Sequence, residues 1–343
     1  MNKVFYQTIL ISLVLMASCK QTPKEKVEKV PDISDKFSIE ILDDTGGTII
    51  DPNASIQVLA SGFEWTEGPL WIEAGNYLLF SDIPRNKVYK LNAENDTTTY
   101  LFPAGFTGTD FAGKEPGSNG LLLDPNGDLV LMQHGNRRVA KMDAPLNDPR
   151  PVFSVIADNF EGKKFNSPND GHYDKSGNLY FTDPPYGLPG IMDDPDKELD
   201  FQGVYCLMAS GELLLIDSLT RPNGVSLSPD EKVLYIAVSD ETHAVWYAYD
   251  VIAPGKVENK RLFYDVTHLI GKEGEQGLPD GMKVNKKGYI FASGPGGIWI
   301  FDPSGKALAR IHTGQKTANC AFSPDQKRLF MTADHYVLSV DLK

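Results

Sequence analysis

Short apolar segments recur along the chain, and a single polar residue precedes each of them. They form six related copies: "EGPLWIEAGNYLLFSD" from Glu67, "NGLLLDPNGDLVLMQHG" from Asn119, "NDGHYDKSGNLYFTD" from Asn169, "NGVSLSPDEKVLYIAVSD" from Asn223, "DGMKVNKKGYIFASG" from Asp280 and "NCAFSPDQKRLFMTAD" from Asn319. In each copy a short strand, a polar turn and a strongly apolar second strand follow one another. The pattern predicts six antiparallel hairpins.

The spacing of the copies predicts the fold. Successive copies start 39 to 57 residues apart, and about 40 to 50 residues accommodate the four strands of a β-propeller blade. We therefore predict an all-β protein, a six-bladed β-propeller with a central channel. Runs between the copies, such as "NKVYKLNA" and "AVWYAYDV", supply the outer strands. Only about three strands remain after Asn319, so we expect the N-terminal run Ser55–Phe63 to close the ring.

The first residues have the pattern of an export signal. Lys3 is followed by an apolar run from Ile9 to Met16 and then by Ala17-Ser18-Cys19, which is the order of regions in a signal peptide. Cys19 in this position resembles the cysteine of a bacterial lipobox. We predict a lipoprotein-type signal peptide over residues 1–18 and a lipid on Cys19. A plain secretory signal is the alternative.

These features predict where the protein resides and how it is divided. Residues 19–36 are charged and contain few apolar side chains, which is typical of a flexible tether. We expect a periplasmic, membrane-anchored lipoprotein of a Gram-negative bacterium, with the propeller domain over residues 37–343.

The net charge indicates which partners the protein can bind, and the cysteines indicate whether it forms disulfide bonds. The formal net charge of the 343 residues is -13, so the surface repels the phosphates of nucleic acids. We expect no nucleic acid partner and a monomer. Apart from Cys19, only Cys206 and Cys320 are present, and their spacing carries no disulfide signature. We predict two buried free thiols.

The polar residue that opens each copy has a special place in a propeller. Because the first strand of every blade lines the channel, these six residues meet at one mouth of it. Asn and Asp also cap turns, but Glu67 is no turn former and occupies the same position. Two carboxylates and several amide oxygens favour Ca²⁺, which takes about six to eight oxygen ligands. Mg²⁺ or Mn²⁺ suits the same set, and Zn²⁺ suits it less well because the set contains no Cys or His.

At this point the chain resembles a known family. The motifs "EGPLW", "NDG", "RPNG", "LPDG" and "NCAF", in this order and spacing, resemble the gluconolactonase, senescence-marker-protein and luciferin-regenerating family over residues 55–342. The resemblance implies a six-bladed propeller with a divalent ion, usually calcium, at the channel mouth. It also implies hydrolysis of sugar lactones such as gluconolactone. Its metal ligands would be Glu67, Asn223 and Asp280, with Asn169 beside the ion, binding substrate or completing the shell.

Further polar residues are candidates for contact with the substrate. Some family members have a substrate-binding arginine two residues before the position of Asn169, where this chain has Ser167. The segment "HGNRRV" resembles one that borders the pocket in bacterial gluconolactonases. The candidates are Asn119, His134, Arg137, Asn169, His172 and Asn319. Solvated positions are the alternative for His134 and Arg137.

The expected reaction is metal-dependent hydrolysis of a sugar lactone or a related cyclic ester. The ion polarises the carbonyl group and activates water. Asp280 is the expected general base and Asp170 is the runner-up. Two alternatives stay open, because propellers carry many functions. One is a non-enzymatic periplasmic binding module with a structural ion, and the other is a different hydrolase or lyase that acts at the same metal.

Overall fold

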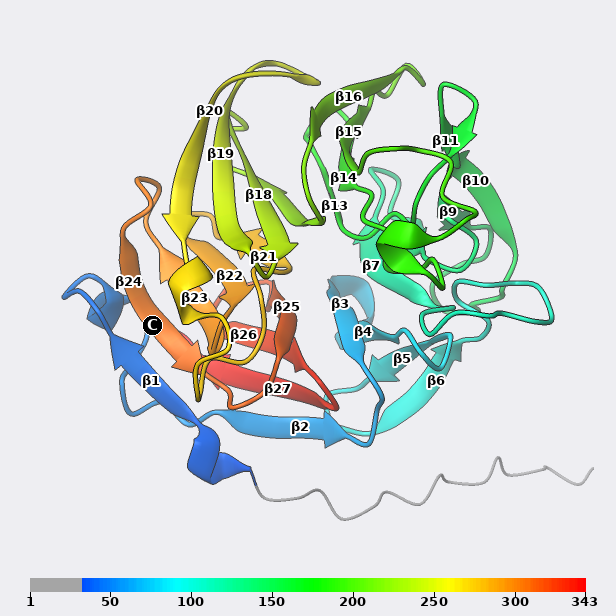
Figure 1. Cartoon of the computed structure of the whole chain (residues 1–343). Helices are drawn as coiled ribbons and strands as arrows, with labels where there is room; N and C mark the ends of the chain where they lie inside the picture. Colours follow the sequence, from blue (N-terminus) through cyan, green and yellow to red (C-terminus); the bar gives the residue numbers. More distant parts are fainter. Residues whose placement is uncertain (1–32) are drawn as a thin grey trace, which may run out of the picture.

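Six antiparallel sheets surround a central axis in the computed structural model, which describes residues 33–343 (Figure 1). The first three blades are β3 (Thr66–Ile72), β4 (Tyr77–Asp82), β5 (Lys87–Leu91) and β6 (Thr97–Leu101); β7 (Ser118–Leu123), β8 (Leu129–Gln133), β9 (Arg138–Met142) and β10 (Phe153–Ala157); and β13 (Gly171–Tyr173), β14 (Leu179–Thr182), β15 (Gly203–Leu207) and β16 (Leu213–Ser218). The next three contain β17 (Pro222–Leu227), β18 (Val233–Asp240), β19 (His243–Ala253) and β20 (Lys256–Asp265); β21 (Met282–Val284), β22 (Ile290–Gly294), β23 (Gly297–Phe301) and β24 (Ala307–His312); and β25 (Thr317–Phe322), β26 (Arg328–Ala333) and β27 (Tyr336–Asp341). The predicted fold class, a six-bladed propeller, is confirmed.

The sixth blade takes its outer strand from the N-terminal side of the domain. Strand β2 (Gln57–Ser61) pairs with β27, with Gln57 opposite Ser339 and Ser61 opposite Tyr336. The predicted closure of the ring by Ser55–Phe63 is therefore confirmed. Closure of this kind joins the N-terminal side of the domain to its last strand by backbone hydrogen bonds, so that β27 is paired on both sides and β2 forms the outer edge of the blade.

The chain before β2 adds an element that the sequence did not predict. Strand β1 (Ser38–Ile41) pairs with β24 and becomes the fifth strand of the fifth blade. Ile33 is buried in the core cluster of the fifth and sixth blades. The folded part thus includes residues 33–36, which the sequence placed in the tether. The predictions for residues 1–18 and for a lipid on Cys19 lie outside the described residues and stay predictions.

The remaining elements are short. Strands β11 (Asn159–Phe160) and β12 (Lys163–Lys164) form a small hairpin after the second blade. Within residues 33–343 the helical segments are single 3-10 turns: η1 (Ser34–Lys36), η2 (Gly46–Thr48), η3 (Glu73–Gly75), η4 (Ile191–Asp193) and η5 (Thr267–Leu269). No helix in this part of the chain is long and apolar enough to cross a membrane.

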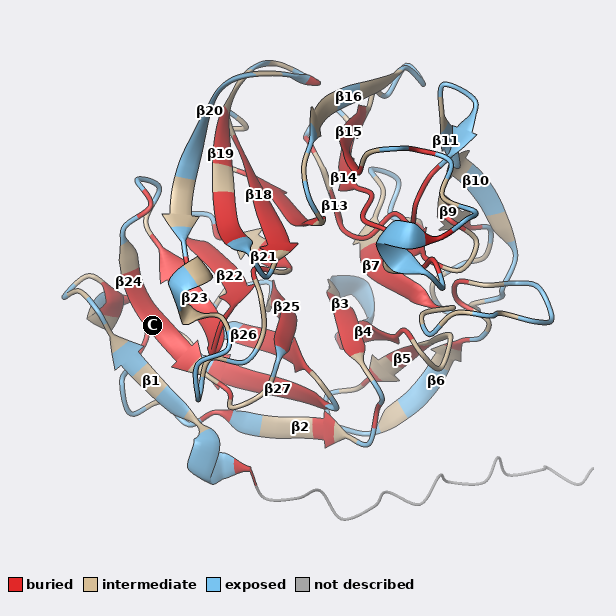
Figure 2. Cartoon of the chain, viewed as in Figure 1, coloured by how far each residue is buried: buried red, intermediate tan, exposed pale blue. Residues whose placement is uncertain are grey.

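The hydrophobic core lies between neighbouring blades. In Figure 2 the inner and middle strands are mostly buried, whereas outer strands such as β10 and β20 are largely intermediate or exposed. Trp246 of the fourth blade packs edge-to-face against Phe301 of the fifth, with ring centroids 5.3 Å apart. Because both faces of these strands are covered, they read as continuous apolar runs. Cys206 and Cys320 are buried and unpaired, as predicted.

Glycine follows the opening polar residue in four of the six copies because the next blade packs against that position. A Cβ on Gly68 would lie 2.2 Å from the carbonyl oxygen of Asn119, and one on Gly224 would lie 2.2 Å from that of Asp280. Gly120 and Gly281 are packed in the same way. Such distances exclude a side chain, so glycine allows the inner strands to approach one another around the axis.

This packing predicts a large effect of one methyl group. Gly224→Ala is expected to lower the free energy of unfolding by about 1–3 kcal/mol, because the inner strands of the fourth and fifth blades have to move apart. Gly47→Ala is the matched control, since a Cβ there has no neighbour within 4 Å. Urea denaturation of both variants measures the difference. Equal stability of the two variants would contradict this account.

Candidate functional site

A cavity of about 520 Å³ lies where the inner strands begin. The first two strands of a blade are antiparallel, so the start of the first lies beside the end of the second. For example, the Asp280 amide donates to the Ser293 carbonyl oxygen at 3.0 Å, and the Asn169 amide donates to that of Thr182 at 2.9 Å. Five of the six predicted channel residues line this cavity: Glu67, Asn119, Asn169, Asn223 and Asp280.

Two of the carboxylates that line the cavity, those of Glu67 and Asp280, are held in an unfavourable environment. Glu67 is 2% exposed, and burial, together with the charge of Asp170, raises its pKa to about 8 although the Gly68 amide donates to its Oε2 at 2.9 Å. Burial and the charge of Glu67 raise the pKa of Asp280 well above its ordinary value. Both pKa values are raised for the same reason: acidic groups are held close together and away from water.

Several oxygens at the cavity have no hydrogen-bond partner. The side-chain Oδ1 atoms of Asn119, Asn169 and Asp280 are buried and unpaired. A buried acceptor without a partner costs about 1–3 kcal/mol. Three such atoms around one cavity therefore indicate a ligand that supplies positive charge or donors to all of them.

The amide of Asn223 is oriented by its neighbours. Its Nδ2 donates to Ser239 Oγ at 3.0 Å, and the Ser239 hydroxyl in turn donates to the carbonyl oxygen of Pro279. Because the side-chain nitrogen of Asn223 is engaged in this way, its side-chain oxygen is left for the cavity that this residue lines. The same chain of bonds ties the fourth blade to the segment that carries Asp280.

This donor set fits a hard divalent cation. The set combines the carboxylates of Glu67 and Asp280 with the amide oxygens of Asn169 and Asn223, and Asn119 adds a further oxygen. Within residues 33–343 no group of three or more His, Cys, Asp or Glu side chains is placed to hold a metal. A cation at this mouth therefore depends on amide oxygens, which suit Ca²⁺, Mg²⁺ or Mn²⁺ better than Zn²⁺.

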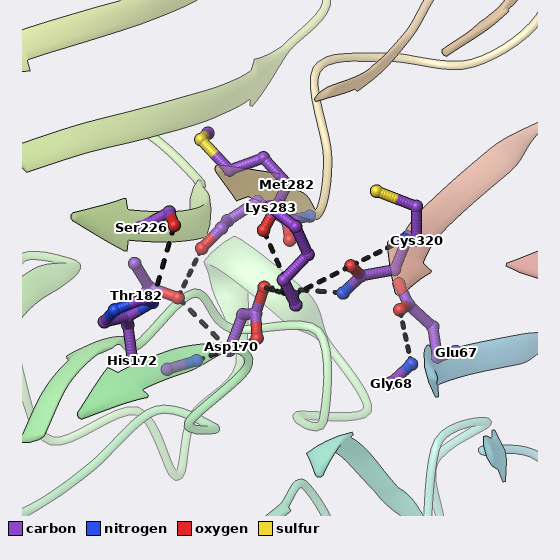
Figure 3. A network of polar contacts seen from close by, with 12 residues as sticks. Glu67, Gly68, Asp170, His172, Thr182, Ser226, Met282, Lys283 and Cys320 are labelled. Atoms are coloured by element: carbon purple, nitrogen blue, oxygen red, sulfur yellow. Dashed lines mark hydrogen bonds and ion pairs between the residues drawn. The ribbon is translucent and has the colours of Figure 1, made fainter. Parts of the chain in front are cut away.

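Two of the predicted site residues lie in a second layer that does not line the cavity. Asp170 is 2% exposed, and its Oδ2 lies 3.9 Å from Lys283 Nζ and 3.4 Å from Asn319 Nδ2 (Figure 3). Asn319 Oδ1 accepts from the Cys320 amide at 2.8 Å and from Lys283 Nζ at 3.3 Å. Burial raises the pKa of Asp170, and the Lys283 ammonium opposes that rise. Asn319, predicted at the mouth, thus serves this buried network.

His172 belongs to the same layer. Its Nδ1 lies 3.4 Å from the Ser226 hydroxyl, as Figure 3 shows. Burial and the nearby Lys283 ammonium lower the pKa of His172 to about 4. The imidazole is therefore neutral near pH 7, and it does not line the cavity.

His134 and Arg137 lie behind the wall of the cavity and do not line it. His134 is fully buried, and its Nδ1 is 2.8 Å from Oε2 of Glu115, which does line the cavity. The Arg137 Nε donates to the carbonyl oxygen of Phe165 at 2.6 Å, and its Nη1 donates to that of Asp196 at 3.0 Å. These bonds hold Arg137 against the segment before the third blade and the loop after its second strand. The predicted contact of Arg137 with a substrate carboxylate stays a prediction.

The sequence did not single out the residues that form the rim. They come from the ends of second strands and from loops between blades: Trp65, Ile83, Glu115, Tyr186, Ser239, Glu241, Lys316 and the segment 270–278. Glu275, which lies in the segment 270–278, forms an ion pair with Arg310 of β24. This ion pair holds the segment against the fifth blade. One signal was available, because the second strands end in the related strings "FSD", "FTD" and "VSD". An antiparallel hairpin places these ends at the same mouth as the opening residues.

Comparisons with known proteins agree with this fold. The family model SMP-30/Gluconolactonase/LRE-like region matches residues 65–335. A gluconolactonase of Zymomonas mobilis is 41% identical over 300 residues, which are 86% of this chain and 83% of that protein. The structure of a gluconolactonase from Xanthomonas campestris matches with a TM-score of 0.76 and 27% identity, over 89% of this chain and 95% of that one.

A more distant structure shares the fold. The calcium-binding protein regucalcin from Agrobacterium tumefaciens matches with a TM-score of 0.64 and 18% identity, over 83% of this chain and 94% of that one. The family model covers the five cavity-lining residues that the sequence had aligned, from Glu67 to Asp280. The chain therefore belongs to the SMP-30, gluconolactonase and luciferin-regenerating enzyme family.

Proposed function

We propose that this protein hydrolyses a sugar lactone and that it does so with a divalent cation, in the first place Ca²⁺, at the mouth of the propeller. The observation that carries the proposal is the group of unpaired buried oxygens of Asn119, Asn169 and Asp280 beside the carboxylate of Glu67. The 41% identical gluconolactonase supports the substrate class. A polyhydroxylated ring also suits the rim, which combines apolar side chains with the polar ones of Glu115, Glu241 and Lys316.

Glu67, Asn169, Asn223 and Asp280 would hold the cation, and Asn119 would bind substrate beside it. Bound there, a divalent cation polarises the lactone carbonyl group and makes water more acidic. Around it the chain fixes the geometry, since the Gly68 amide holds Glu67 Oε2 and Ser239 holds the Asn223 amide. Ligands that are held in place before binding reduce the ordering cost when the ion and substrate bind.

Asp280 is the proposed general base. It lines the cavity and its Oδ1 has no other partner, so it is free to accept a proton from a water molecule held there. Asp170 is less well placed for this role, because it lies below the cavity and is engaged by Lys283 and Asn319. We propose that Asp170 instead orients this second layer, which lies beneath Glu67 and Asp280.

The first test is hydrolysis. Purified protein, residues 20–343, is expected to hydrolyse δ-gluconolactone in the presence of Ca²⁺ and to lose activity on chelation. Asp280→Ala is expected to lower kcat/KM by about a hundredfold or more, because a proton acceptor and a ligand are lost together. A pH-stat measures the acid that is released. Activity that survives both chelation and Asp280→Ala would refute this mechanism.

The second test is independent of turnover. Calcium at about 100 times its Kd is expected to stabilise the folded protein by about 2.7 kcal/mol, which raises Tm. The rise should be much smaller in Asp280→Asn and unchanged in Glu94→Gln, since Glu94 is exposed on an outer turn of the first blade. Differential scanning calorimetry measures it. A calcium-dependent Tm without turnover of any lactone would favour a binding module with a structural ion.

The third test concerns the second layer. Lys283→Met leaves the buried Asp170 carboxylate without its cation and is expected to cost about 2 kcal/mol of unfolding free energy. Adding Asp170→Asn should recover at least half of that loss, because no unpaired charge remains. Urea denaturation of the two single variants and the double variant measures the coupling. Additive losses would show that the two side chains do not stabilise each other.

A further inference from the structure

Glu115 is an acidic residue of the cavity wall that the proposed mechanism does not use. It lies in the loop before β7 and lines the cavity together with Glu67, Asn119 and Tyr186. Its Oε2 is 2.8 Å from His134 Nδ1. In the described part of the chain no lysine or arginine nitrogen lies within 4.0 Å of its carboxylate, so His134 is its partner there.

His134 is fixed in place on several sides. Its amide donates to the Gly117 carbonyl oxygen at 3.0 Å, and its carbonyl oxygen accepts from the Arg137 amide at 3.0 Å. Gly187 packs against it so closely that a Cβ on this glycine would lie 2.9 Å from the His134 Cβ. The imidazole is fully buried. A ring confined in this way holds the carboxylate of Glu115 at one position on the wall.

The exposure of the two side chains shows which of them, Glu115 or His134, can contact a ligand in the cavity. His134 Nε2 is buried and without a partner, whereas the Glu115 side chain is 31% exposed and faces the cavity. In an acid–base dyad the imidazole would be the member open to the substrate. Here the carboxylate is open, so its second oxygen is the available hydrogen-bond acceptor and His134 is a positioning residue.

The position of Glu115 is electrostatically unfavourable without a ligand. It lines the same cavity as the carboxylates of Glu67 and Asp280. Retaining a third carboxylate beside two others opposes folding unless a bound group uses it. Hydroxyl groups are suitable, because they donate to a carboxylate without bringing further charge into the cavity.

We propose that Glu115, positioned by His134, accepts a hydrogen bond from a ring hydroxyl of the substrate and so selects polyhydroxylated lactones over unsubstituted ones. The inference rests on the proposed lactone hydrolysis and assigns its substrate specificity to a residue outside the cation's ligand set. A site that is built to accept from a hydroxyl discriminates strongly against an analogue that lacks it.

Kinetics with two lactones test the proposal. The substrates are δ-gluconolactone and δ-valerolactone, which has the same ring size and no hydroxyl groups. In Glu115→Gln the ratio of kcat/KM for the first to that for the second is expected to fall about tenfold or more, mainly through KM. Glu94→Gln is the matched control, because it makes the same substitution at an exposed residue of an outer turn that does not line the cavity. Its ratio should stay within about twofold of the wild type.

The role of His134 is tested by a pair of variants. His134→Asn keeps a nitrogen donor near the position of Nδ1, and His134→Leu removes it. His134→Asn is expected to retain most of the selectivity, and His134→Leu to lose it to the extent seen in Glu115→Gln. Thermal unfolding identifies variants that fold. If neither variant folds, Glu115→Gln against Glu94→Gln decides the proposal.

A binding experiment separates this proposal from the hydrolysis itself. The probe is 1,5-anhydroglucitol, which keeps the ring hydroxyls and lacks the carbonyl group, with tetrahydropyran as the bare ring. NMR titration should show binding of the former that weakens in Glu115→Gln. Such binding without lactone turnover would overturn the proposed reaction and leave the hydroxyl site standing. Equal losses on both lactones, or unchanged binding of the polyol, would overturn the inference about Glu115.

Discussion

The close approach of the inner strands at the mouth of the propeller is the constraint on which the site depends. Gly68, Gly120, Gly224 and Gly281 bring each blade's inner backbone against the first residues of the next, at distances that exclude a Cβ. Polar side chains that are far apart in the sequence thereby converge on one cavity. In the other two copies Asp170 and Cys320 occupy the glycine position, and Asp170 places its carboxylate in the layer beneath the mouth.

Convergence has an electrostatic cost that explains how the polar residues are arranged. Burial raises the pKa of Glu67, Asp280 and Asp170, and the charge of Asp170 adds to the rise at Glu67 and at Asp280. The chain offsets this cost below the cavity with Lys283, 3.9 Å from Asp170. At the mouth itself no lysine or arginine of the described residues pairs with Glu67 or Asp280, and unpaired oxygens surround them. Of the two layers, the lower one has a positive charge of its own in Lys283.

The mouth combines two kinds of residue with different origins. The oxygens suited to a cation stand at the starts of inner strands, where the backbone of the ring fixes them. The rim is formed by loops and by the ends of second strands, including Glu115, Tyr186 and Glu241. This division suggests that the ring sets the chemistry and the loops set the choice of substrate, as in other scaffolds whose loops carry specificity.

The sequence alone determined the six repeats, the all-β fold, the closure by β2 and the five cavity-lining residues from Glu67 to Asp280. These follow from local patterns, because a strand's period and a turn's residues are set within one hairpin. The tertiary structure alone decided what the residues behind and below the mouth contact. Asn319 shares its position in the repeat with the other five, yet it bonds Asp170 and Lys283. His134 meets Glu115 only because two loops pack together. Such contacts depend on how blades pack, which no pattern within one repeat encodes.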